Sequence, residues 1–157
     1  MNKLSVISIG FAFFGLNMAA NATEFDQYLQ QKKIIDAQYK IQNKKELNDL
    51  LAVLSAEDSK TLPLQIDQNT LIEKLVLTSN QTVLNGKITT PEFTALEKSL
   101  GKKEINKRIH QNLTKNCPIF FEHEYQRRNP YNVKLILTSA SSNKYEVDFS
   151  LKDCNSK

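Results

Sequence analysis

The spacing of hydrophobic residues changes along the chain and divides it into segments. From Glu24 to about Ala56, apolar residues recur three or four positions apart in a polar background without glycine or proline. This spacing predicts helices, either two or one long helix broken near Asn43. Residues 56–63 read as a polar linker, because Pro63 blocks helix. Between about 70 and 89, apolar and polar residues alternate instead, which predicts strands.

Two turn signals compete to define the hairpin in this alternating region. Asn85-Gly86 is ordinarily the stronger one, but it leaves too little chain before Pro91 for a good partner strand. A turn at 79–81 gives two strands of similar length, over about 70–78 and 82–89. We favour this second turn, which places Gly86 inside a strand, at a bulge or at a close approach of another backbone.

A long amphipathic helix is predicted next. Thr90-Pro91-Glu92 combines a capping threonine, a proline at the first helical position and an acid in the first turn. One apolar face then continues to about Asn116, with a bend expected at Gly101, and Pro118 ends the helix. Alternation returns at 133–138 and 145–152 and predicts two further strands. Residues 119–128 fit neither pattern clearly.

This order of elements predicts an α+β fold in which an antiparallel sheet of four or five strands packs on one main helix, in the order ββαββ. We divide the chain into residues 1–22, a helical N-terminal arm and linker at 23–61, and an α+β domain at 62–157. The arm has two interpretations. It packs on the open edge of the sheet, or it binds a partner through Phe25, Tyr28 and Tyr39.

The first 22 residues have the pattern of a secretory signal peptide. Lys3 provides the positive charge, Leu4 to Leu16 form a short apolar stretch, and Ala20-Asn21-Ala22 provides the small residues at the cleavage site. The stretch is short for a membrane span, which needs about 20 apolar residues. We therefore expect cleavage before Thr23, a periplasmic or secreted protein, and no stable membrane anchor after cleavage.

The charge and glycine content of the chain limit the kinds of partner and cofactor that we expect. Removing Lys3 with the signal segment lowers the formal charge of +4 by one, and the basic pairs along the remaining chain are interleaved with acids. Nucleic-acid binders usually concentrate basic residues on one face, so nucleic acid is not an expected partner. The mature chain contains only Gly86 and Gly101, which excludes the glycine-rich loops that hold nucleotide cofactors. We expect no cofactor.

The two cysteines, Cys117 and Cys154, are expected to form a structural disulfide. An even pair in an exported chain usually does so, and the bridge would close a loop of about 38 residues. A redox-active pair would normally have C-x-x-C spacing, and zinc would need more ligands. Because Cys117 follows the main helix and Cys154 follows the last strand, the bond would join these two elements.

Some of these residues also carry a resemblance. Leu62-Pro63-Leu64-Gln65-Ile66-Asp67, then Thr70, Cys117 and the final Asp153-Cys154, together resemble a pattern in small exported bacterial proteins of unassigned activity. The resemblance covers about residues 62–154. It implies the same disulfide and a similar fold, and it implies no catalytic residue.

The densest group of acid-base side chains is Glu122-His123-Glu124. On a strand, the two glutamates would share one face and His123 would project from the other. Such a pair could act as acid and base or bind a divalent cation. Surface ion pairing with Arg127 and Arg128 is the simpler interpretation. The two histidines of the chain do not form a zinc motif, so no catalytic or metal site is predicted.

The sequence thus favours a non-catalytic periplasmic or secreted interaction module of inhibitor, immunity, chaperone or secretion-accessory type. Its expected partner is another envelope or secreted protein. The alternative is a small hydrolase, or a protein that binds a cell-envelope polymer, that uses the Glu122-His123-Glu124 segment.

Overall fold

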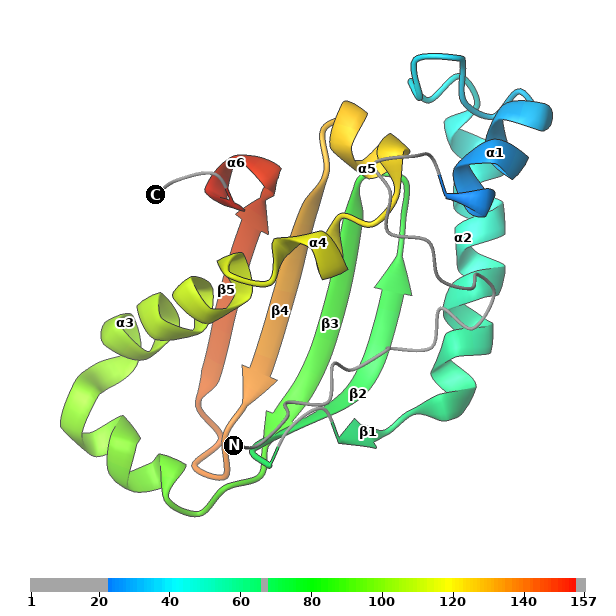
Figure 1. Ribbon diagram of the computed structural model, residues 1–157. Helices are drawn as coiled ribbons and strands as arrows, with labels where there is room; N and C mark the ends of the chain where they lie inside the picture. Colours follow the sequence, from blue (N-terminus) through cyan, green and yellow to red (C-terminus); the bar gives the residue numbers. More distant parts are fainter. Residues whose placement is uncertain (1–22, 66–67, 155–157) are drawn as a thin grey trace, which may run out of the picture.

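The computed structural model describes residues 23–65 and 68–154, which form a five-stranded sheet with helices (Figure 1). The predicted signal segment lies outside the described residues. The strands are β1 (Leu64–Gln65), β2 (Thr70–Leu77), β3 (Gln81–Ile88), β4 (Asn132–Thr138) and β5 (Lys144–Ser150). The α-helices are α1 (Glu24–Gln31), α2 (Lys44–Asp58), α3 (Phe93–Thr114), α4 (Cys117–Phe120), α5 (Glu124–Arg128) and α6 (Leu151–Cys154), and a short 3-10 turn covers Ser59–Thr61.

The α+β class is as predicted, but the sheet is mixed rather than antiparallel. Its spatial order is β1-β2-β3-β4-β5, and all neighbouring strands run antiparallel except β3 and β4. The connection between β3 and β4 passes through α3, α4 and α5, and such a crossover lets the chain re-enter the sheet in the same direction. The ββαββ order is also wrong, because β1 precedes the predicted hairpin and three helices form the crossover.

Helices α3 and α4 lie across one face of the sheet. Figure 1 shows α3 and α4 crossing in front of β5 and β4, while α2 runs beside β2. On this face the strands alternate buried aliphatic and aromatic side chains, as their sequence pattern predicts. The members from the four long strands are Ile72, Leu75, Leu77, Leu84, Ile88, Val133, Leu135, Leu137, Tyr145, Val147 and Phe149.

The hairpin turn follows the favoured prediction. Strands β2 and β3 are joined at residues 78–80, and Gly86 pairs with Ile72 inside β3. A β-carbon built on Gly86 would lie 2.5 Å from the carbonyl oxygen of Leu71, and the register shifts between Ile72 and Lys74. Glycine is therefore required here by the close approach of the neighbouring backbone beside a bulge.

Gly101 interrupts α3, as the sequence predicted. Its φ of 71° and ψ of 160° are not helical, and glycine adopts a positive φ without the steric cost that a β-carbon brings. The helix begins at Phe93, and Glu92 at its N-cap makes no side-chain capping bond. Pro118 does not simply end the helix, because α4 starts at Cys117 with this proline in its first turn, where no backbone N–H is needed.

The N-terminal arm shares the hydrophobic core of the sheet. Its buried contributions include Phe25 and Leu29 from α1 and Leu51 from α2. Helix α2 is also tied to the β2–β3 hairpin by hydrogen bonds, because Ser55 Oγ accepts the Leu77 N–H and Asn48 Oδ1 accepts the Ser79 N–H, each at 2.8 Å. Among the described residues, no helix has the length and apolar character needed to cross a membrane.

Candidate functional site

The Glu122-His123-Glu124 segment begins a helix and is not a strand. His123 is the N-cap of α5, and its backbone N–H donates to Oε1 of Gln126 at 3.0 Å. Its side chain is only 5% exposed and packs against the rings of Phe25 and Tyr125. The interpretation of this whole segment as surface charge is therefore wrong for His123, because α1 covers it.

A buried carboxylate from α1 caps this helix start. Asp26 is fully buried, and its Oδ2 and Oδ1 accept the backbone N–H groups of Glu124 and Tyr125 at 2.9 and 3.2 Å. Oδ2 also accepts the backbone N–H and the hydroxyl of Thr23, at 3.2 and 2.9 Å. Four donors match the roughly four lone-pair positions of a carboxylate, so the acceptor capacity of Asp26 is used by the fold.

The hydroxyl of Thr23 links Asp26 to the histidine. Thr23 Oγ1 accepts the Asp26 N–H at 3.1 Å and lies 2.8 Å from His123 Nδ1. Thr23 donates its one hydroxyl proton to Asp26 Oδ2, and its contact with His123 Nδ1 joins the carboxylate to the ring. Burial lowers the pKa of His123 to about 4, against the opposing effect of the Asp26 carboxylate, so the ring is neutral at pH 7.

We call this arrangement the Asp26 network. It comprises the side chains of Thr23, Asp26 and His123 and the backbone N–H groups of Glu124 and Tyr125. The sequence did not predict a role for the first two members, Thr23 and Asp26. Thr23-x-x-Asp26 does have the form of a helix capping box, and α1 contains one, but no local signal shows that the same carboxylate also caps a helix 98 residues away.

The two glutamates of the segment differ in their surroundings. Glu124 pairs with Arg127 at 2.7 Å and with Arg128 at 3.2 Å, which agrees with the predicted ion pairing. Glu122 has an exposed side chain, and its carbonyl oxygen accepts a hydrogen bond from Arg127 at 3.0 Å. Burial of part of its carboxyl group raises the pKa of Glu122, although Arg127 opposes the shift. The two carboxylates are therefore held by different contacts rather than as one acid-base pair.

The acid-base side chains of the described residues also bear on whether the protein holds a metal ion. Within residues 23–65 and 68–154, no group of three or more histidine, cysteine or acidic side chains has the geometry to hold a metal ion. His123 Nδ1 is engaged by Thr23, and the oxygens of Asp26 already accept four hydrogen bonds. The acid-base groups that the structure brings together thus hold α1 against α5.

The three aromatic residues considered for partner binding lie in different environments. Phe25 is 6% exposed and belongs to the core, where its ring packs against His123 and Tyr125. This burial corrects the prediction that Phe25 contacts a partner. Tyr28 is 40% exposed, with the Lys32 ammonium 5.7 Å from its ring centroid. Tyr39 is half-buried in the connection between α1 and α2.

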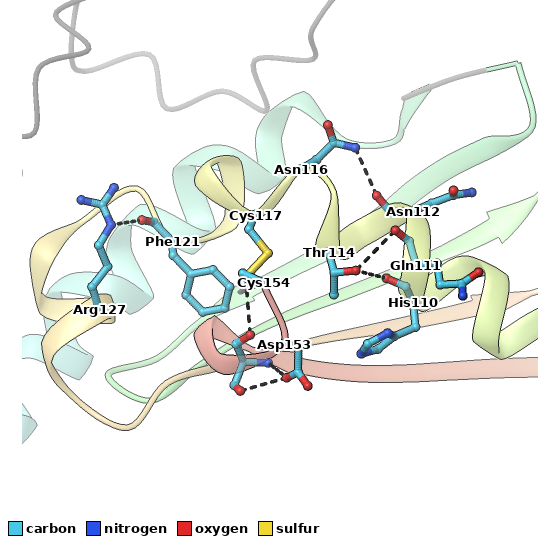
Figure 2. The surroundings of a disulfide bond; sticks show 11 residues. His110, Gln111, Asn112, Thr114, Asn116, Cys117, Phe121, Arg127, Asp153 and Cys154 are labelled. Atoms are coloured by element: carbon cyan, nitrogen blue, oxygen red, sulfur yellow. Dashed lines mark hydrogen bonds between the residues drawn. A yellow bond between two sulfur atoms is a disulfide. The ribbon is translucent and has the colours of Figure 1, made fainter. Parts of the chain in front are cut away.

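The predicted disulfide is present. Cys117 and Cys154 are bonded with their α-carbons 5.8 Å apart, which lies within the usual range for a disulfide. Figure 2 shows the bond joining the first residue of α4 to the last residue of α6, beside the ring of Phe121. Asp153 Oδ2 accepts the backbone N–H and the hydroxyl of Ser150, at 2.7 and 2.9 Å, and so fixes the turn that leads from β5 to Cys154.

The other face of the sheet carries no described helix and has a mixed surface. Val76 pairs with Val83 across β2 and β3, and Asn85 pairs with Ile136 across β3 and β4. The side chains of these three aliphatic residues are half-buried. They adjoin a charged group in which Lys134 lies 3.1 Å from Glu146 and 3.9 Å from Asp148. We call this surface the open sheet face.

Comparison with known proteins identifies no family. No protein-family model matches the chain, and a search of curated proteins finds no match. Among solved structures, a protein assigned as secreted from Pseudomonas aeruginosa shares 14% identity at a TM-score of 0.48, covering 71% of this chain and 96% of its own. The type 2 secretion pilotin EpsS from Vibrio vulnificus shares 8% identity at a TM-score of 0.41, covering 73% and 96%. These values are too low to carry an argument about function.

Proposed function

We propose that this chain is an exported protein that acts by binding another envelope or secreted protein, without catalysing a reaction. Export is supported by the signal-peptide pattern of residues 1–22 and by the disulfide, which is typical of oxidising compartments. The resemblance of residues 62–154 to small exported bacterial proteins agrees with the same destination.

The observation that carries the proposal is the use of the acid-base residues by the fold itself. Asp26, His123 and Thr23 satisfy one another and the start of α5, and Glu124 is held between two arginines. A catalytic base must have its lone pair within reach of a substrate proton. Both carboxylate oxygens of Asp26 already accept protein hydrogens, which favours a structural role for this group.

The open sheet face supports binding as the activity. Half-buried Val76, Val83 and Ile136 lie beside an ion-paired patch of Lys134, Glu146 and Asp148. Protein interfaces commonly combine apolar contacts with a polar rim of this kind. The mixed apolar and charged character of this surface is also typical of surfaces that bind proteins.

Site-specific photo-crosslinking in the native envelope tests the proposal. A photoreactive amino acid replaces Val83 on the open sheet face or, as the matched control, Val53, which is 62% exposed on α2. We expect a discrete protein adduct from position 83 that excess unlabelled protein suppresses, and none from position 53. Equal labelling at both positions, insensitive to competition, would contradict binding through the open sheet face.

The hydrolase alternative has its own test at Glu122, the exposed acid of the segment. Glu122→Gln removes the charge while leaving the Asp26 network intact. If purified protein hydrolysed an envelope polymer, and this variant lost that activity at unchanged thermal stability, the catalytic alternative would replace the binding proposal. We expect no such loss.

A further inference from the structure

The Asp26 carboxylate is fully buried, yet no lysine or arginine pairs with it in the part of the chain that the structure describes. Its partners are two backbone N–H groups of α5 and the backbone nitrogen and hydroxyl of Thr23. The nearby His123 is neutral at pH 7. Burying a carboxylate is costly without a compensating positive charge, and neutral donors offset only part of this cost.

The atom best placed to supply that charge is the Thr23 nitrogen, 3.2 Å from Asp26 Oδ2. In the full chain this nitrogen belongs to a peptide bond and is neutral. The predicted cleavage site lies immediately before it. Water adds across the Ala22–Thr23 bond, Ala22 leaves with the carboxylate, and Thr23 keeps the amine, which takes up a proton below its pKa of about 7.7–8.0.

We propose that removal of residues 1–22 creates a partly buried salt bridge between the new Thr23 ammonium and Asp26, which fastens α1 to the start of α5. Processing thereby stabilises the exported form of the fold relative to its precursor. The inference rests on the export and cleavage part of the proposed function, and it does not depend on partner binding.

The salt bridge between Thr23 and Asp26 should also affect how α1 packs on the rest of the fold. Asp26 joins α1 to Glu124 and Tyr125, and Phe25, the neighbouring residue on α1, packs on His123 and Tyr125. Strengthening the Asp26 contacts therefore also holds the packing of α1 against the crossover between β3 and β4. A precursor that lacks the ammonium is expected to release α1 more readily.

The test compares the processed protein, which starts at Thr23, with a chain that retains one extra residue, Ala22. The extension moves the ammonium by one residue, about 3.8 Å along the chain, and turns the Thr23 nitrogen back into an amide. Urea unfolding is followed at pH 7 and at pH 10. At pH 7 we expect the unfolding equilibrium constant of the processed chain to be about tenfold smaller, which corresponds to a rise of about one unit in the pKa of its amine.

The expected rise in the pKa of the Thr23 amine determines how the stability of the processed chain depends on pH. An amine whose pKa is raised in the folded state stabilises the fold below about pH 8, and this contribution disappears as the pH passes the raised value. The charged and titratable groups in and around the Asp26 network are Asp26 and Glu24 on α1, Glu122 and His123 before α5, and Glu124 and Arg127 within it. Both chains contain all six, so their titration cancels in the comparison. The advantage of the processed chain should be absent at pH 10.

Equal stability of the two chains at pH 7, or an equal response to pH, would overturn the salt bridge while leaving the proposed binding function untouched. Mass spectrometry of the exported protein forms the second arm. A first residue other than Thr23 would overturn the inference at its premise. As a further control, Asp26→Asn is introduced into both chains. The difference in stability between the processed and the extended chain should then vanish.

Discussion

Oδ1 of Asp26 accepts the backbone N–H of Tyr125 at 3.2 Å, across 99 residues of sequence. This contact joins the first helix of the described chain to the last helix of the crossover between β3 and β4. Both partners are buried, so the bond is shielded from competing water. The N-terminal arm, although polar in sequence, is therefore attached to the folded core.

Loss of either cysteine should destabilise the protein strongly. Cys117→Ser and Cys154→Ser each open the loop of about 38 residues and should each lower the free energy of unfolding by about 2–5 kcal/mol. The double variant should be little worse than either single one, because both residues act through one bond. Urea unfolding of the oxidised proteins measures this. Additive losses would mean that the cysteines contribute separately.

Phe25 and Tyr28 provide a matched pair of aromatic residues on α1. Phe25→Ala empties a site in the core and should cost about 3–5 kcal/mol, whereas Tyr28→Ala removes a ring that is 40% exposed and should cost below about 1 kcal/mol. Thermal or urea unfolding of the two variants distinguishes the sites. Similar small losses would indicate that α1 is not packed in the core.

Glu97 on α3 should make stability depend on acid pH. Burial opposes its ionisation, but donors from the β4–β5 loop and the Tyr145 hydroxyl, at 2.6 Å, lower its pKa from 4.5 to about 2. A lowered pKa stabilises the fold above the ordinary value, and this contribution is lost as the pH falls from about 4.5 toward 2. Glu97→Gln should therefore lower the midpoint temperature at pH 6 and change it little at pH 2.

Glu104 on the same helix, whose side chain is 40% exposed, is the control for this experiment. It pairs with Arg108 at the surface, so Glu104→Gln should shift the midpoint only slightly at either pH. A shift for Glu97→Gln that is as large at pH 2 as at pH 6 would contradict the role assigned to the ionised carboxylate.

The elements that the sequence predicted well are those governed by local patterns. Alternation located β2 to β5 closely, and the competition between two turn signals correctly placed Gly86 inside a strand. The disulfide was predicted from the expected export of the chain and from the elements before each cysteine, and it is present. These features depend on neighbours in sequence or on a single pair of residues.

The relationships that the sequence did not predict all join distant segments. Parallel pairing of β3 with β4 depends on how the whole crossover returns to the sheet, and β1 has only two residues, too few for a periodic signal. The role of Asp26 depends on its distance from Glu124 and Tyr125 in the folded protein. A charged side chain is rarely buried, and here four hydrogen bonds allow the burial of Asp26.

The most direct test of this account is the stability of Asp26→Asn in the processed protein. The amide has the same shape but no charge, and its nitrogen cannot accept a backbone N–H. We predict a loss of about 2–4 kcal/mol in the free energy of unfolding, with faster hydrogen exchange at the Glu124 and Tyr125 amides. Asp49→Asn, at an exposed ion pair on α2, should lose no more than about 0.5 kcal/mol. Wild-type stability and unchanged exchange in Asp26→Asn would contradict the central role of the Asp26 network.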